Sequence, residues 1–171
     1  MPNMSKHSLS AEQTRFIEDV VALMVPWGMP QMSARIYGYL LLHAQPVSLD
    51  QITDDLEVSK STTSVAARLL ENHMLIRRQS ERGTKRVLYV ASETSAGLLT
   101  EKSFLIGEMG RLLETRAETV ATGDAVRRMQ AIGKFHLSVR TALDTLINEL
   151  TAGGDGKPLP GPELVDDLQT D

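Results

Sequence analysis

The fold is decided by residues 48–70, which read SLDQITDDLEVSKSTTSVAARLL. The segment holds two short apolar helical patterns, separated by a tight connection at Glu57-Val58. Ser48 and Ser59 can each cap the helix that follows, because a serine oxygen accepts a hydrogen bond from a free N–H group of the first turn. This spacing predicts a helix-turn-helix whose second helix runs to about His73.

A hairpin follows the second helix. Leu75 and Ile76 begin a predicted strand, residues 80–85 form a polar loop around Gly83, and residues 87–90 form the returning strand. Glycine permits the tight turn that a hairpin tip needs. The expected fold class is therefore mainly α with a small β-hairpin wing, a winged helix-turn-helix, extended by long helices.

Further helical patterns lie on both sides of this unit. A helix should begin at the capping box Ser10-x-x-Gln13 and end at Pro26 and Gly28, and another should run from Pro30 to about Ala44. Trp27 could line a ligand pocket, but we favour a plug that packs the first helix onto the following domain. Two long apolar patterns follow the wing, with Asp124 as the expected cap of the second.

These patterns divide the chain into four parts. Residues 1–29 form an N-terminal tail and dimerisation helix, residues 30–92 the winged domain, and residues 93–152 the C-terminal dimerisation helices. Residues 153–171 are rich in Gly, Pro and acidic side chains, so we expect a disordered acidic tail. The apolar stripe of the last helix persists for ~27 residues, roughly 40 Å. A small domain cannot cover that length, so we expect a homodimer.

Positive charge is concentrated in one segment. The chain has 171 residues and a formal net charge of −4, but residues 60–86 hold seven Lys or Arg and two Glu, a local charge of +5. A local basic surface matters more for phosphate binding than the overall sum. The segment therefore favours double-stranded DNA as a partner.

The candidate DNA contacts follow from the docking geometry of a helix-turn-helix. The N-terminal residues of its second helix meet base edges in the major groove, and the wing reaches phosphates or a flanking minor groove. We expect Ser61, Thr62, Ser64, Val65 and Arg68 to point outward. The complete predicted set is Ser59, Lys60, Ser61, Thr62, Ser64, Val65, Arg68, Arg78, Arg82, Lys85 and Arg86, although Arg77 is as well placed on its strand as Arg78.

Other classes of function find little support. The chain has no cysteine, and its histidines do not stand at metal-ligand spacing, so we expect no metal site. We find no nucleophile–base pair and no phosphate loop. We therefore expect no catalytic residues and no cofactor, and we expect that the protein is not an enzyme. No signal peptide or membrane-length apolar run is present, so we expect a cytoplasmic protein without membrane contact.

The segment around the predicted turn resembles a known family. Val47-Ser-Leu-Asp-Gln-Ile, Leu56 to Ser64, Leu75-Ile-Arg-Arg, Gly83 and Tyr89 resemble the winged-helix core of the MarR family of transcriptional regulators. Arg35-Ile-Tyr-Gly38 resembles the GbsR-like branch more closely. The resemblance covers roughly residues 15 to 92. It implies a homodimer in which the first helix and the last two long helices are intertwined, bound to a palindromic operator.

One position departs from the family pattern. Met74 stands where the family usually has glycine, and methionine can adopt a left-handed turn there only at some cost. The function we expect is a sequence-specific regulator, a repressor that responds to a small-molecule effector of unknown identity. The alternative is a winged-helix protein-interaction module that does not bind DNA.

Overall fold

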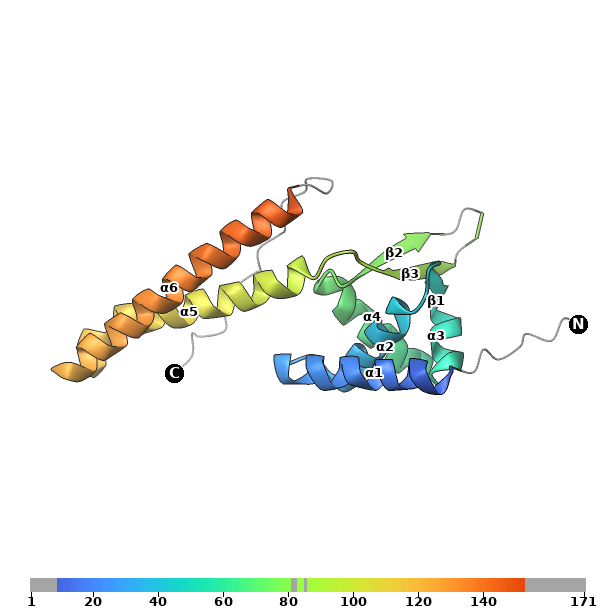
Figure 1. Cartoon of the computed structure of the whole chain (residues 1–171), viewed down its shortest axis with the longest axis horizontal. Coiled ribbons are helices and arrows are strands. Elements are labelled where there is room, and N and C mark those ends of the chain that lie inside the picture. The colour runs from blue at the N-terminus through green and yellow to red at the C-terminus, as the bar shows by residue number, and fades with distance from the viewer. Residues whose placement is uncertain (1–8, 81–82, 85, 153–171) are drawn as a thin grey trace, which may run out of the picture. The chain divides into compact units, whose positions relative to one another are not determined.

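The computed structural model describes residues 9–80, 83–84 and 86–152, and the chain divides into two compact units between Ser95 and Ala96 (Figure 1). The first unit has helices and strands in the order helix, helix, strand, helix, helix, strand, strand. Its elements are α1 (Ala11–Met24), a 3₁₀ turn (Val25–Trp27), α2 (Gln31–Leu41), β1 (Val47–Ser48), α3 (Leu49–Asp55), α4 (Lys60–Asn72), β2 (Ile76–Ser80) and β3 (Val87–Ala91). The predicted mainly α fold with a small winged sheet is confirmed.

The N-terminal helix α1 begins at the predicted capping box. The Ser10 hydroxyl accepts from the Gln13 N–H at 3.1 Å, and the Gln13 side-chain oxygen accepts from the Ser10 N–H at 2.9 Å. Farther along, α1 lies close against α2, because a Cβ at Gly38 would stand 3.3 Å from Ile17 Cα. The predicted stop at Gly28 is a left-handed residue with φ 91°. Helix α1 is thus an integral part of the first unit.

Trp27 does not act as the predicted plug. It lies in the 3₁₀ turn after α1 and is 52% exposed, so it does not pack α1 onto the rest of the first unit. The burial falls instead to Ile17, Val21 and Met29, which are nearly inaccessible to solvent. Smaller aliphatic side chains fill this contact, and the expectation for Trp27 was wrong.

The core of the first unit lies between α2, α3 and α4. Its largest fully buried aliphatic side chains are Ile36, Leu40, Ile52, Leu70 and Leu75. Helix α2 ends at Leu41, earlier than the predicted Ala44. The reason is that the amides of residues 42 and 43 bond to carbonyls three residues back, a tighter turn that does not continue an α-helix.

The sheet has three strands in the order β1-β3-β2, all antiparallel. Strand β1 pairs Val47 with Tyr89, and its two residues are too few for the alternation by which a strand is predicted. Strand β2 begins at Ile76 and not at Leu75. The Leu75 N–H bonds to the Leu70 carbonyl at 2.9 Å, so this amide group belongs to the hydrogen bonds that end α4.

The second unit is a helical hairpin of α5 (Ala96–Val120) and α6 (Asp124–Thr151). The helices approach most closely at Gly110 and Gly133, where a Cβ on either would stand 3.0 Å from the other's carbonyl oxygen. The N-cap of α6 is Gly123, with φ 58°, so the expectation that Asp124 caps this helix was wrong. A left-handed backbone suits glycine better than aspartate, and Asp124 pairs with Arg127 instead.

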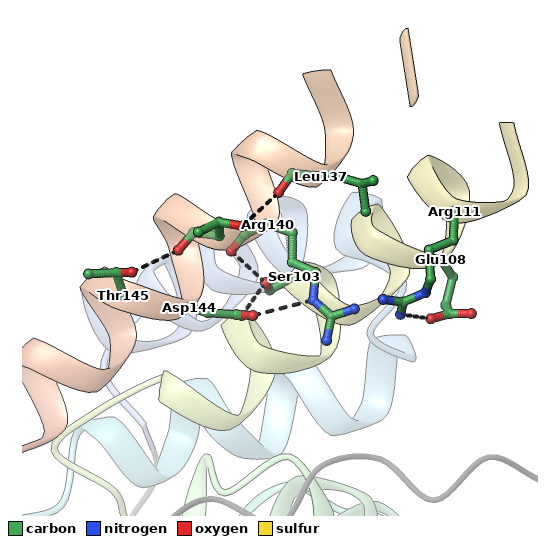
Figure 2. Close-up of polar contacts among 8 residues, drawn as sticks. Ser103, Glu108, Arg111, Leu137, Arg140, Asp144 and Thr145 are labelled. Carbon is green, nitrogen blue, oxygen red and sulfur yellow. Dashed lines mark hydrogen bonds and ion pairs between the residues drawn. The ribbon is translucent and has the colours of Figure 1, made fainter. Parts of the chain in front are cut away.

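A polar cluster joins the two helices of the hairpin (Figure 2). The buried Ser103 hydroxyl donates to Asp144 Oδ1 at 2.5 Å, and Arg140 Nε donates to Asp144 Oδ2 at 3.3 Å. The Arg140 guanidinium stands 5.8 Å from the centroid of the Phe104 ring. It also crosses Gly107, where any Cβ would collide with the arginine side chain. The inner face of this hairpin therefore includes small and polar residues beside aliphatic ones such as Leu137 and Ile147.

Candidate nucleic-acid interface

The predicted recognition helix α4 begins with a group of hydroxyls. Ser59 is its N-cap, and the Ser59 oxygen accepts from the Thr62 N–H at 3.1 Å. The same oxygen lies 3.0 Å from the Ser61 hydroxyl and 2.7 Å from the Thr62 hydroxyl. All three side chains are exposed. The first turn of α4 therefore presents a preorganised set of donors and acceptors to solvent, together with free N–H groups that suit an anion.

The turn before α4 contains a strained residue. Glu57 has φ 53°, in the left-handed region that non-glycine residues seldom adopt. The Val58 N–H bonds to the Thr53 carbonyl at 3.1 Å and the Glu57 N–H bonds to the Asp54 carbonyl at 3.4 Å. This pair of bonds is the Schellman motif that ends a helix. It fixes the direction in which the chain leaves α3 and enters α4.

Two side-chain contacts hold α3 against its neighbours. The Thr53 hydroxyl donates to the buried Thr63 hydroxyl of α4 at 3.2 Å. The Tyr39 hydroxyl of α2 donates to Asp55 Oδ2 at 2.6 Å. Burial of the Tyr39 ring, with the Asp55 carboxylate beside it, raises the pKa of this phenol well above its usual range. These contacts orient α4 relative to α2 and α3, and the sequence analysis predicted none of them.

The outward face of α4 agrees with the prediction at four of five positions. Ser61, Thr62 and Arg68 are exposed, and Val65 is exposed by 68%. Ser64 is only half-buried, so it points outward less than expected. The inward face holds Thr63, Ala66, Ala67 and Leu70, whereas Leu69 is half-buried.

The two arginines of β2 lie on opposite faces of the sheet. Arg78 pairs with Tyr89, and Arg77 pairs with Val90, so their side chains project to different sides. Burial raises the pKa of the Tyr89 phenol, as does Glu71, and the positive charges of Arg78 and Arg68 oppose this. Arg78 therefore lies on the Tyr89 face of the sheet, and the charge of Arg68 on α4 also acts on this phenol. Arg77, which the sequence left as an equal candidate, lies on the other face.

The wing is described only in part. Gly83 has φ 85° with open space around it, which suits the predicted tip. Arg86 is exposed, and its backbone N–H bonds to the Thr84 hydroxyl at 3.2 Å. The predicted contacts Arg82 and Lys85 lie outside the described residues.

Lys60, the first residue of α4, is in an ion pair. Its Nζ atom lies 2.7 Å from Oδ1 of Asp50, in the first turn of α3. The hydrogen bond and charge of Lys60 lower the pKa of the Asp50 carboxyl, and the charge of Arg86 lowers it further. Asp50 was not among the predicted site residues. The sequence signal for it was weak, because ten residues separate the partners and the pairing depends on the angle between α3 and α4.

The first unit also has an open groove of about 380 Å³ beside α4, lined in part by Pro30, Met32, Ser61 and Val65.

Within the described ranges 9–80, 83–84 and 86–152, no group of three or more His, Asp or Glu side chains is arranged to hold a metal ion. Among the helices of these same ranges, none has the length and apolar character needed to cross a membrane.

Comparisons with known proteins give one informative result. No family model and no curated protein matches the sequence. A solved structure described as "Crystal Structure of a transcriptional regulator" matches with a TM-score of 0.67 and 18% sequence identity, over 82% of this chain and 99% of that one. At this identity the match shows that the two chains share a fold.

Proposed function

We propose that the chain is a transcriptional regulator that binds double-stranded DNA as a homodimer. The observation that carries the proposal is the exposed N-terminal half of α4, held in place by its N-cap and by Thr63, with Arg68 and Arg78 beside it. Hydroxyls, guanidinium groups and a small apolar side chain are the groups that read base edges in the major groove. Helix α4 is the recognition helix in this proposal.

The predicted contacts divide into two kinds. Ser61, Thr62, Val65 and Arg68 are exposed along α4 and are assigned to bases, with the half-buried Ser64 at their margin. The second set is assigned to phosphates or to a flanking minor groove, and its members are Ser59, Lys60, Arg78, Arg82, Lys85 and Arg86. The first set would determine sequence preference and the second would add affinity for any DNA.

The proposed family is the GbsR-like branch of MarR regulators. The shared fold with a protein described as a transcriptional regulator supports this assignment. Met74 supports it as well, because its φ of 54° is the left-handed geometry for which the family uses glycine.

Exposed apolar side chains support the homodimer. On α6, Ile132, Phe135, Leu146 and Leu150 are exposed, and Phe135 is exposed by 65%. With Val139 and Ala142 between them, these residues follow one another at intervals of three and four, which forms a single stripe on a helix. A stripe of this spacing is typical of a helix that packs on a partner helix.

Two further helices have exposed apolar residues of the same kind. On α5 they are Leu105, Met109, Leu112 and Val120, and on α1 they include Phe16, Leu23 and Trp27. These are the helices that the family resemblance implicates in dimerisation. We propose that a second copy of the chain covers them and places two recognition helices about one DNA turn apart, as a palindromic operator requires.

Regulation by a ligand belongs to the proposal in general form. A small molecule that favours one spacing of the two recognition helices would shift the dimer toward or away from DNA. We propose a repressor that releases its operator in this way, with an effector of unidentified chemistry.

The experiment that tests DNA binding is selection of bound duplexes from a random pool, followed by a salt titration of the affinity for the selected sequence. We expect a palindrome with half-sites about 10 bp apart and an affinity that falls steeply between about 50 and about 200 mM salt. Arg78→Ala should weaken binding to all sequences, whereas Arg77→Ala, which removes the same charge from the opposite face, is the matched control.

The alternative is a protein-interaction module that uses the winged domain without DNA. It is distinguished by the same measurement, because it predicts no enrichment from the pool and no affinity with a steep salt dependence. Equal losses for Arg78→Ala and Arg77→Ala would contradict the assigned face of the wing and leave DNA binding itself standing.

A further inference from the structure

A carboxylate lies among the cations assigned to DNA phosphate. Asp50 Oδ1 is 2.7 Å from Nζ of Lys60, and both side chains are exposed to solvent. Lys60 is the first residue of the proposed recognition helix, next in sequence to the exposed hydroxyl residues Ser59 and Ser61. The carboxylate therefore already accepts from the cation that a DNA phosphate would need to contact.

The second cation near Asp50 comes from the wing. The charge of Arg86 favours the ionised form of the carboxyl, which indicates that the two groups lie near enough to interact. Arg86 is exposed directly before β3, and it belongs with Lys60 to the set assigned to phosphates. The Asp50 carboxylate thus interacts with two cations of the proposed interface, Lys60 of α4 and Arg86 of the wing.

A contribution to folding is a poor explanation of this pair. Ion pairs between two exposed side chains add little to stability, because water screens them and both side chains lose freedom. The angle between α3 and α4 is already fixed by the Thr53–Thr63 hydrogen bond and the turn at Glu57. The pair therefore affects the affinity for a ligand that competes for Lys60 more than it affects the stability of the fold.

We propose that Asp50 is an internal competitor of the DNA backbone, which holds Lys60 in the free protein and lowers the affinity for DNA of any sequence. This inference rests on the proposed DNA-binding function and names a regulating residue of the same site. To bind a phosphate, Lys60 must leave or share the Asp50 carboxylate, and the phosphate must approach that negative charge.

The effect falls most heavily on non-specific DNA. Phosphate contacts supply essentially all of the affinity for non-specific sequences, whereas specific binding gains further from base contacts. A restraint on phosphate binding therefore shortens the time that the regulator spends on the wrong DNA. Asp50 would act as a determinant of specificity without touching a base.

The test is a double-mutant cycle in the full chain. The variants are Asp50→Asn, Lys60→Gln and the combination of both, with Asp50→Glu as the conservative variant that keeps the charge. Asp19→Asn, at an exposed carboxylate of α1, is the control for the same change in net charge. Affinity is measured by fluorescence anisotropy on a random-sequence duplex of about 30 bp, from about 50 to about 200 mM salt.

We expect Asp50→Asn to tighten binding about fivefold and to steepen the salt slope by about one, because one more cation reaches a phosphate. Lys60→Gln alone should change affinity less than about twofold, but in the Asp50→Asn background it should remove most of the gain. Asp50→Glu and Asp19→Asn should bind like the wild type. Equal melting temperatures of the variants show that each is folded.

Two outcomes would overturn the inference in different ways. If Asp50→Asn binds no better than the wild type, or gains as much with Lys60→Gln as without it, Asp50 does not restrain Lys60, while DNA binding stands. If the wild type binds no duplex even at about 50 mM salt and none is selected from a random pool, the proposed function itself fails and the inference falls with it.

Discussion

The two units of the chain differ in how far their large apolar side chains are buried. In the first unit Ile36, Ile52 and Leu70 are inaccessible to solvent and form an interior core. In the second unit, α5 and α6 come close at Gly107, Gly110 and Gly133 and share a cluster of polar groups, and few large apolar side chains are fully buried. The first unit therefore has an apolar core of its own, although α1 exposes Phe16 and Leu23, whereas the second unit leaves many of its large apolar residues on its surface.

This difference indicates how each unit gains its stability. Burial of apolar area is the main favourable contribution to folding, and the first unit obtains it within one chain. The exposed residues of α5 and α6 gain this contribution only when another surface covers them, and we propose that a second copy of the chain does so. We therefore expect the stability of the second unit to rise more steeply with protein concentration than that of the first, which contributes α1 to the proposed dimer.

The largest effect should come from Leu70→Ala. This side chain is fully buried, so the substitution should lower the free energy of unfolding of the first unit by about 3 kcal/mol. The matched variant is Leu112→Ala on α5, where the side chain is 55% exposed within the chain. Denaturant unfolding at several protein concentrations distinguishes the two, because only the Leu112 variant should show a loss that depends on concentration. Equal and concentration-independent losses would contradict the division between the units.

The next effect concerns the exposed stripe of α6. Phe135→Glu places a charge in the proposed interface, and we expect it to weaken dimerisation by at least about 2 kcal/mol, or roughly thirtyfold. Lys134→Glu, at the neighbouring exposed position, is the control that changes charge outside the stripe. Sedimentation or light scattering over a dilution series measures the dimer. A wild-type chain that stays monomeric at high concentration would rule out the proposed assembly.

A smaller effect should appear at alkaline pH in the first unit. Because the pKa of Tyr39 is raised in the folded state, its contribution to stability is complete below the ordinary phenol pKa of about 10 and is lost as the pH rises toward the folded value. Tyr39→Phe should cost about 1 kcal/mol at neutral pH and should reduce the decline above pH ~10. Ser103→Ala removes a hydrogen bond from the second unit and should leave the alkaline decline unchanged. Chemical denaturation as a function of pH measures both.

The smallest effect should be a gain in stability. Glycine adopts a left-handed backbone without strain, so Glu57→Gly should relieve the turn before α4 and stabilise the first unit by up to about 1 kcal/mol. The control is Asp54→Gly, because a glycine inside α3 should destabilise by about 1 kcal/mol. Thermal unfolding measures both, and a loss of stability in Glu57→Gly would contradict the account of this turn.

Much of the first unit could be predicted from local sequence. Capping residues such as Ser10 and Ser59 act within one helical turn, so a short window of sequence contains the whole interaction. The left-handed turn at Met74 was indicated in another way. The family resemblance marked that position as one where glycine is usual. The winged arrangement followed once these helix ends were placed.

The rest depended on contacts that no local pattern contains. Strand β1 is a strand only because Val47 pairs with Tyr89, far along the chain. The pairing of Asp50 with Lys60 depends on the angle between two helices. The single stripe predicted for the last helix is in fact shared between two faces, because Gly133 and Ile147 point toward α5 while Ile132 and Leu146 are exposed. Periodicity cannot separate two apolar faces of one helix.

The helix-end motifs on either side of α4 have a practical consequence for engineering. Before the helix the chain is fixed by the bonds of the Glu57 turn, and after it by the bonds from Met74 to Glu71 and from Leu75 to Leu70. Neither set involves the side chains of Ser61, Thr62, Val65 or Arg68. These four positions can therefore be randomised together as a library for new DNA targets, while the frame that presents them stays intact.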